Sequence, residues 1–478
     1  MQQFTHPELI RGLGPIAAIS INVGNIIGTG IFLKARVMTC NVGTPWRVIL
    51  VWVVAGLLAL AGALTYAELT TMRPHAGAEY VITKDAYGRV WGFLNGWSQF
   101  LISRTASAAA LAVGFSIFMN DLLGGKLNAV YFTYPVPGFG EVPFGSLQVV
   151  ALITIAVTTL INCAAVSVSG HVASFITILK VLVVLGVGVG AFFYQDGSWS
   201  HLGMANTASC AGEVTGAGVF GFGAAMLGAL WAYDGWNNIS YMAGEVKHPE
   251  RNLPLALIGS MLIIIALYVL VNVSYYYVLT PTEVASVPLK SSVAAEAVRR
   301  VLGDAAQAGS SLYGPLAVSF MAAVMMLSSW GSLQTSILGT ARIPFAMARD
   351  GVFFQSLARV SRSTKVPVIS LIVQGIWAGV LTLSGTFDQL TNLAVFAFWL
   401  FYGMVAAAVF VFRWREPDAP RPYRTWGYPV VPALFVLVTI CLIVVTIYND
   451  PLRSVAGLAI IAAGLPVYFY FSRKNRAA

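Results

Sequence analysis

Charged residues are scarce in this chain of 478 residues, since Asp, Glu, Lys and Arg together make up only 10% of it. Soluble domains carry about 25% charged residues, so a soluble globule of this size would have too few charges to cover its surface. Hydrophobic residues make up 58% of the sequence, which also excludes intrinsic disorder, because disordered chains are poor in apolar residues. The composition therefore indicates an all-α polytopic membrane protein.

Cysteine and histidine are also rare, with four and five copies. Their irregular spacing matches no metal-binding pattern, so we expect no metal site, and no motif indicates a cofactor. Cys40 and Cys210 fall in predicted outer loops, where a disulfide is one interpretation. From the sequence alone we favour the other interpretation, two unrelated thiols.

Long apolar runs with few charges account for twelve predicted transmembrane helices, each needing about 20 residues. The runs cover residues 12–33, 48–67, 90–120, 142–179 (one helix and most of a second, which continues to 194), 214–244, 252–282, 305–341, 366–387, 389–412, 425–449 and 454–472. An even number of crossings places both termini on one side of the membrane.

The net charge of +9 is explained by topology. Basic clusters at residues 342–365 and 413–424 lie on the same predicted side as the termini. The positive-inside rule then makes both termini cytoplasmic, in a multi-pass protein of the plasma (inner) membrane. Such clusters face anionic lipid of the bilayer, and we expect no nucleic-acid partner.

Two predicted spans contain glycines and polar residues at mid-membrane depth. The first is interrupted at Gly24, Gly28 and Gly30, and the sixth at residues 230–238. An opened helix bares N–H and C=O groups, which are costly in hydrocarbon unless protein, water or ligand meets them. Paired breaks in matching spans indicate a transporter site between two five-helix repeats of opposite topology. Close helix packing through small residues is the competing interpretation.

These breaks would offer two opposite poles to one small solute. Free N–H groups at the start of a half-helix suit a carboxylate, and carbonyls released beside the breaks suit an ammonium group. The pair of poles fits a zwitterionic α-amino acid. The predicted substrate-binding residues are Ile26, Ile27, Gly28, Thr29, Gly30, Trp231, Ala232, Asp234 and Gly235.

Five motifs in order along the chain resemble the amino acid–polyamine–organocation superfamily, and within it the L-type amino acid transporter family. They are Gly24-Asn-Ile-Ile-Gly28-Thr29-Gly30-Ile-Phe, Pro74-His-Ala-Gly-Ala-Glu79-Tyr80, Leu230-Trp-Ala-Tyr-Asp-Gly-Trp-Asn237, Glu245-Val-Lys-His-Pro249-Glu-Arg-Asn-Leu-Pro254, and the segment from Ala341-Arg342 to Asp350-Gly351. The resemblance covers nearly the whole chain.

The resemblance implies a LeuT-like five-plus-five inverted repeat in which helices 1 and 6 are unwound. We expect a single transmembrane domain over residues 1–478, with repeats at 12–195 and 214–412 and helices 11 and 12 at 425–472. Trp231 stands where the family usually carries a bulky aromatic that caps the pocket on its outer side, so it is the expected gate.

The resemblance also bears on partners. Animal members of the family attach an ancillary subunit through a cysteine in the outer loop after the third span. The corresponding residues 121–145 contain no cysteine, so we expect no disulfide-linked subunit.

Lys180 lies inside the predicted fifth span, where charge is costly and usually functional. The resemblance matches it to a lysine at the position where sodium-coupled members of the wider fold bind an ion. Our first interpretation is a fixed tether that donates to carbonyls near Gly24 and to hydroxyls such as those of Ser328 or Ser329. A proton carrier and an incidentally paired lysine stay open as alternatives.

Two further ionisable residues fall in predicted spans. Arg104 is expected to face the bundle interior and to hold helices together, with a partner that the sequence does not name. Asp234 departs from the small residue of several family members. It is expected to cap free N–H groups, with binding of a cationic group or a proton as alternatives. Residues 71–88 predict an amphipathic cytoplasmic helix.

Together these features predict a secondary active transporter that exchanges neutral L-amino acids without sodium, by alternating access. A proton-coupled amino acid permease of the same fold is the alternative, and a carrier of cationic amino acids or polyamines a more distant one. An enzyme is not expected, because the spans hold no nucleophile–base pair. A channel would favour a repeated pore element or a charged ring.

Overall fold

The structure is a computed structural model that describes residues 13–73, 78–136, 140–164, 170–210, 218–307, 313–361, 364 and 366–474. Within these ranges, eight helices or continuous helical segments are long and apolar enough to cross a membrane, or nine if one bent pair is counted as a span. The protein is therefore a polytopic helical membrane protein, as its composition predicted.

The helices occupy most of the described chain. The long ones are α3 (Pro45–Met72), α5 (Arg89–Ser98) continued by a π-helical turn (Gln99–Ser103) into α6 (Arg104–Leu122), α7 (Ser146–Cys163), α8 (Gly170–Gly190), α10 (Pro249–Val278), α13 (Tyr313–Thr340), α16 (Phe387–Arg415) and α17 (Val430–Asn449). The shorter ones are α1 (Pro15–Ile26), α2 (Gly30–Val42), α4 (Ala78–Tyr87), α9 (Val219–Tyr233), α11 (Pro281–Ser286), α12 (Val293–Gln307), α14 (Arg342–Arg349), α15 (Val368–Thr382), α18 (Pro451–Ala462) and α19 (Gly464–Lys474).

Local sequence explains where several helices begin. Proline at the first turn of α1 and α3 is favourable, because that position has no helical partner for an N–H group. Thr280 and Glu283 form a capping box at the start of α11, and Thr386 and Gln389 form another at the start of α16. The first turn of α16 meets α2 through Asp388, whose carboxylate lies 2.5 Å from the Lys34 ammonium.

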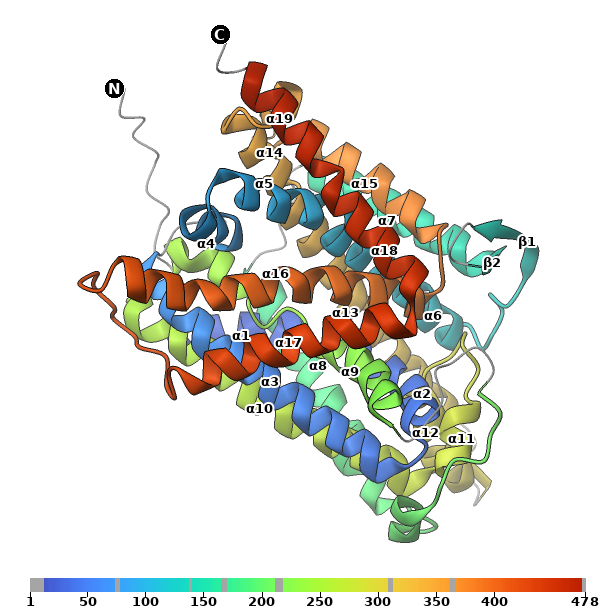
Figure 1. Ribbon diagram of the computed structural model, residues 1–478. Helices are drawn as coiled ribbons and strands as arrows, with labels where there is room; N and C mark the ends of the chain where they lie inside the picture. Colours follow the sequence, from blue (N-terminus) through green and yellow to red (C-terminus); the bar gives the residue numbers. More distant parts are fainter. Residues whose placement is uncertain are drawn as a thin grey trace.

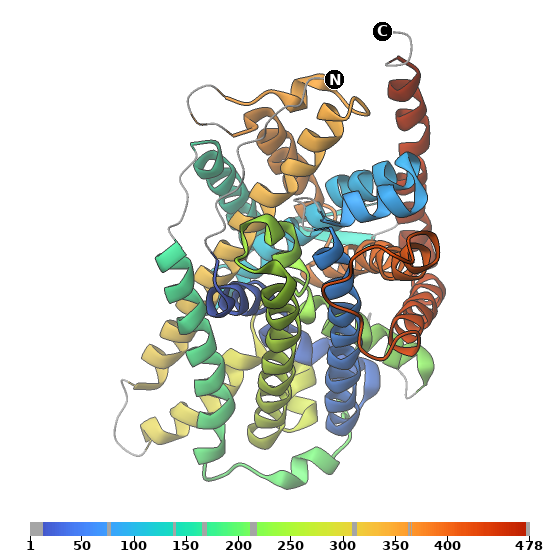
Figure 2. The same ribbon diagram turned by 90° about the vertical axis from the view of Figure 1, so that its left-hand side faces the viewer.

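The long helices pack as a bundle, and different short helices lie at its two ends. In Figures 1 and 2, α3 and α10 run side by side, and α4 and α5 lie at the opposite end of the molecule from α11 and α12. Strands β1 (Val130–Val136) and β2 (Gly140–Gly145) form an antiparallel hairpin between α6 and α7, and it projects at the right of Figure 1.

Cys40 and Cys210 form a disulfide, with 5.7 Å between their Cα atoms. Our preference for two unrelated thiols was wrong. The cause is local. Gly43 ends α2 in a left-handed conformation, and its carbonyl accepts a hydrogen bond from the Asn206 N–H at 2.8 Å. This contact brings the segment after Trp199–Gly203 to the end of α2, across a separation of 170 residues.

Candidate binding site at two helix breaks

The first span is broken at residues 27–29. Helix α1 ends at Ile26, α2 begins at Gly30, and their axes bend by 44°. Ile27 leaves the helical region with a ψ of 96°. Among the described residues, no hydrogen bond uses the N–H groups of Gly28, Thr29 or Gly30. Three donors at the positive end of α2 are thus available to a ligand.

The second break follows α9, which ends at Tyr233. Asp234 is extended, with a ψ of 150°, and Gly235 has a φ of +97°, which favours glycine over any other residue. The chain resumes at Asn238 as a 3₁₀ helix, Asn238–Glu245. Both interruptions fall within the predicted segments but are shorter than predicted, since Gly24 still lies in α1 and residues 230–233 still lie in α9.

The two breaks touch each other. A Cβ atom added to Gly30 would lie 2.5 Å from the Cα of Ala232, which is closer than real Cβ atoms approach. A Cβ added to Gly235 would lie 3.0 Å from the carbonyl oxygen of Asn25. Glycine at both positions is thus required for the backbones of the two broken spans to meet.

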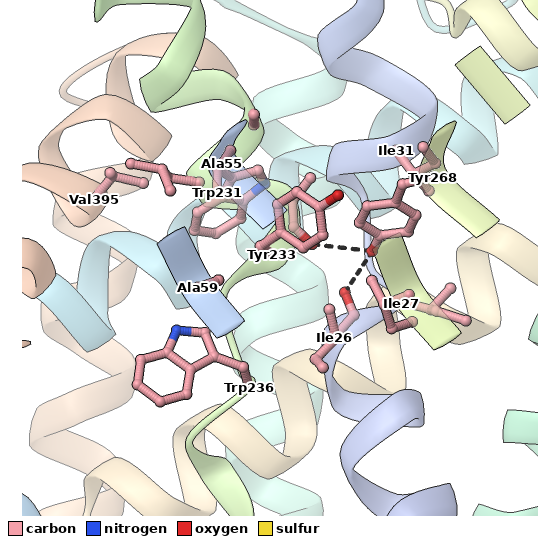
Figure 3. Packing of buried hydrophobic residues seen from close by; sticks show 14 of the residues in the cluster. Ile26, Ile27, Ile31, Ala55, Ala59, Trp231, Tyr233, Trp236, Tyr268 and Val395 are labelled. Carbon is pink, nitrogen blue, oxygen red and sulfur yellow. Dashed lines mark hydrogen bonds between the residues drawn. The ribbon is translucent and has the colours of Figure 1, made fainter. Parts of the chain in front are cut away.

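Side chains from α10 and α1 hold the breaks together. The buried Tyr268 hydroxyl contacts the carbonyl oxygens of Ile26 and Ala232, each at 3.0 Å, so it bridges the two spans (Figure 3). Asn22 donates to the carbonyl of Trp236 at 2.9 Å. The sequence did not predict Tyr268 or Asn22 as contacts of the breaks, because it does not tell which face of α10 or α1 meets them.

Trp231 lies over the first break. Its indole Nε1 donates to the Thr29 hydroxyl at 3.2 Å, and its ring meets the edge of Phe387 at 6.3 Å between centroids. Its side chain is buried. The residue that the sequence nominated as a gate therefore contacts one of the three residues with free N–H groups. Phe387, which comes from α16, was not predicted.

Lys180 reaches the first break from α8. Its ammonium donates to the carbonyl oxygens of Gly24 at 3.0 Å and Ile27 at 3.3 Å. Ser328 on α13 also donates to the Ile27 carbonyl, at 3.3 Å, whereas Ser329 donates to Leu111. The ammonium group therefore joins α8 to the first break. Lys180 and Ser328 thus both donate to the Ile27 carbonyl, and the Ser328 hydroxyl does not accept a hydrogen bond from Lys180.

The remaining released carbonyls are partly occupied. The Trp231 carbonyl accepts the Asp234 N–H at 3.2 Å, and those of Ile26 and Ala232 share one tyrosine hydroxyl. A carbonyl oxygen has two lone pairs, so Ile26 and Ala232 each keep one for a ligand. Ile27, with two donors already, has none to spare.

Arg104 finds its partners in the segment after the second break. It donates to the side chains of Asn238 at 3.3 Å and Tyr241 at 3.1 Å, and its guanidinium lies over the rings of Tyr241 and Phe398. Asp234 accepts a hydrogen bond from the Tyr402 hydroxyl at 2.9 Å and interacts with the N–H of Gly235. The role of Asp234 as a cap, which the sequence suggested, stays a prediction.

In the described ranges, no group of three or more His, Cys, Asp and Glu side chains could hold a metal ion. The chemistry of the site is thus carried by backbone groups and by a few buried polar side chains.

A bundle of apolar helices in which two broken spans meet defines a polytopic membrane protein of the transporter class. The family model described as amino acid permease matches residues 13–471. The chain belongs to this family. Its relatives are amino acid transporters of the amino acid–polyamine–organocation superfamily.

Full-length relatives agree with this assignment. The chain is 29% identical over 474 residues to the serine/threonine exchanger SteT of Bacillus subtilis (strain 168), covering 98% of each chain. It is 29% identical over 468 residues to the human b(0,+)-type amino acid transporter 1, covering 97% of this chain and 88% of the relative. It is 28% identical over 481 residues to the human cystine/glutamate transporter, covering 97% and 86%. The family and these relatives are membrane transporters and not enzymes.

Proposed function

We propose that this protein is a secondary active transporter that exchanges neutral L-amino acids without sodium, by alternating access. One observation carries the proposal: the two helix breaks meet and present unused N–H groups on one side and carbonyl acceptors on the other. Family membership and exchanger relatives support it.

The substrate carboxylate would bind the N–H groups of Gly28, Thr29 and Gly30. Its ammonium group would bind the carbonyls of Ile26 and Ala232, which each retain a lone pair. The substrate would lie against Asp234, Gly235 and Trp231 in the second break, with Trp231 as the outer gate.

Sodium independence follows from Lys180. Its ammonium already supplies a positive charge to the carbonyls of Gly24 and Ile27. A sodium ion at this place would have to compete with it for the same oxygens. We therefore propose Lys180 as a fixed replacement for an ion.

We propose twelve spans in all. Eight long segments, which lie in α3, α5–α6, α7, α10, α13–α14, α16, α17 and α18–α19, and the bent pair of α1 and α2 make nine. Three shorter apolar helices would complete the number: Thr177–Phe193 in and after α8, Val219–Tyr233 (α9) and Val368–Thr382 (α15). Their order fits a LeuT-like pair of five-helix repeats, at 12–195 and 214–412, followed by two helices at 425–472.

We place both termini in the cytoplasm and the protein in the plasma (inner) membrane. The disulfide of Cys40 and Cys210 supports this orientation, since disulfides persist in oxidising compartments and both cysteines fall on the predicted outer side. The absence of a disulfide-linked subunit stays a prediction. One relative, the large neutral amino acids transporter small subunit 2 of Oryctolagus cuniculus, is named as a small subunit.

Counterflow in proteoliposomes tests the proposal. Vesicles loaded with unlabelled amino acid should take up labelled amino acid in saturable fashion without sodium, and faster than empty vesicles do. Competition by a panel of neutral, acidic and cationic amino acids and polyamines defines the class of substrate. Uptake that requires sodium, or that ignores internal substrate, would refute exchange.

A proton-coupled permease is the second candidate, because two carboxyl groups lie at the second break: that of Asp234, which is partly buried, and that of Glu79, which is buried and contacts Asn237. An inward proton gradient should then drive accumulation into vesicles that contain no amino acid. An exchanger would show no such accumulation.

A further inference from the structure

Glu79 carries a buried carboxyl group that is not among the proposed substrate contacts. Glu79 lies on the short helix α4, and only 1% of its surface is exposed. One carboxylate oxygen accepts hydrogen bonds from the Asn237 amide and, at 3.4 Å, from the Tyr66 hydroxyl; the other accepts from the Gln99 amide at 3.2 Å. Asn237 belongs to the second helix break, so Glu79 joins α4 to that break.

All of these donors are neutral. Within the described part of the chain, no Lys or Arg lies within ion-pairing distance of Glu79 or of Asp234. Arg104 acts on both carboxyl groups through its field, while its own donors go to Asn238 and Tyr241. Two carboxylates and one guanidinium would leave an uncompensated negative charge in a buried region, which is costly.

The amide of Asn237 shows where a compensating proton fits. Asn237 is fully buried, and its side-chain oxygen has no hydrogen-bond donor among the described residues, while its amide nitrogen donates to Glu79. An ionised carboxylate only accepts, whereas a protonated carboxyl group also has an O–H to donate. A proton on Glu79 would supply a donor beside the one polar atom of Asn237 that lacks a partner.

We propose that Glu79 binds a proton, as a carboxylic acid paired with the Asn237 amide, and that this proton sets the geometry of the second break. The inference rests on the proposed function and deepens it, because it assigns pH regulation to the same substrate site. Loss of the proton leaves the Asn237 oxygen without a donor and a carboxylate without a counter-charge, so substrate affinity falls as the pH rises.

Titratable groups from several neighbouring elements surround Glu79. They are Tyr66 on α3, Arg104 on α6, Asp234 and Tyr241 at the second break, and Tyr402 on α16. Burial raises the pKa of the Glu79 carboxyl group above its ordinary value, and the positive charge of Arg104 opposes the rise. The charged groups at the outward side of α4 are paired elsewhere, Asp85 with Arg73 and Lys84 with Asp350.

Equilibrium binding of a labelled amino acid to the purified full-length protein, measured from about pH 5 to pH 9, tests the proposal. The affinity of the wild type should fall as the pH rises. The fall should be roughly tenfold if substrate binding raises the pKa of the Glu79 carboxyl group by one. Glu79→Gln is neutral at every pH, so it should bind the amino acid across the whole pH range with the affinity that the wild type shows at low pH. Asp85→Asn, on the same helix but more exposed, should keep the wild-type profile.

A flat wild-type profile, or a Glu79→Gln variant that keeps the wild-type pH dependence, would overturn the proton site. Absence of amino acid binding at every pH would instead refute the proposed function. Infrared difference spectra between acid and alkaline pH provide a readout that needs no transport. The band of a protonated carboxyl group should be present in the wild type and in Asp234→Asn and absent from Glu79→Gln, and the opposite pattern would contradict the assignment.

Discussion

At the scale of single residues, the site depends on a few atoms that hold the unwound backbone. Gly30 permits the contact between the two breaks, Tyr268 bridges two of their carbonyls, and Lys180 engages two more. Tyr268 and Lys180 each meet carbonyl oxygens that hydrocarbon would leave unsatisfied. Substitution of any one should therefore affect substrate binding more than it affects overall folding.

Gly30→Ala should weaken substrate binding, because its Cβ would lie 2.5 Å from the backbone of Ala232. Overpacking of this kind costs about 1–3 kcal/mol, or roughly fivefold to a hundredfold in affinity. Gly28→Ala is the matched control, since its Cβ would meet only the Ile26 carbonyl, at 3.9 Å. Equal affinity of the two variants in a binding assay would show that the breaks do not meet as described.

Lys180→Met should lower the rate of sodium-free exchange by about tenfold or more, because hydrogen bonds from a charged donor contribute about 1.5–3 kcal/mol and two carbonyls would lose it. Lys126→Met, at an exposed lysine of the loop before β1, should exchange at the wild-type rate. Wild-type exchange by Lys180→Met would remove the tether from the mechanism.

The sequence predicted some of these residues and missed others for a physical reason. Lys180 was found because a charge in an apolar run is conspicuous, and Gly28 and Gly30 because glycine interrupts a helix. Tyr268 and Phe387 were missed because aromatic side chains are common in membrane helices. Asn22 was missed because the sequence does not tell which neighbouring helix its amide faces. Only the rotation of α1, α10 and α16 decides which of their faces meets the breaks.

At the scale of helices, α2 and α16 are joined by an ion pair. The Lys34 ammonium lies 2.5 Å from a carboxylate oxygen of Asp388 and 2.6 Å from the Thr391 hydroxyl. The Lys34 side chain is 1% exposed and that of Asp388 is 23% exposed. Asp388 directly follows Phe387, the ring that meets Trp231, so the ion pair and the gate contact share one turn of α16.

This unequal burial predicts unequal costs of substitution. Asp388→Ala leaves a buried ammonium without its counter-charge and should cost about 3 kcal/mol of stability. Lys34→Met leaves a carboxylate that water can reach and should cost less, about 1 kcal/mol. Thermal unfolding of the purified variants measures both, and the double variant should recover part of the loss. Equal losses from the two single variants would contradict the burial described.

Helix positions were easier to predict than helix ends. Apolar runs located the long spans, because each must satisfy its backbone within the membrane. The sequence did not show that α2 starts at Gly30, or that a π-helical turn precedes Arg104. Such details depend on contacts with neighbouring helices, which no single run of residues records.

At the scale of the whole molecule, the disulfide and the basic clusters make a joint prediction of topology. In a variant with Cys163 and Cys441 changed to Ser, a cysteine at Lys126→Cys should react with a membrane-impermeant reagent added to intact cells. A cysteine at Arg359→Cys should react only after the membrane is opened. Both positions are exposed, so the reverse pattern would overturn the orientation.

The central claim is that the two breaks bind both ends of one amino acid. Its most direct test is competition against a labelled amino acid in purified protein, using the same amino acid with its carboxylate amidated or its amine acetylated. The account predicts that either change abolishes competition, because each removes one charged pole. Equal competition by the amidated or the acetylated compound would contradict it.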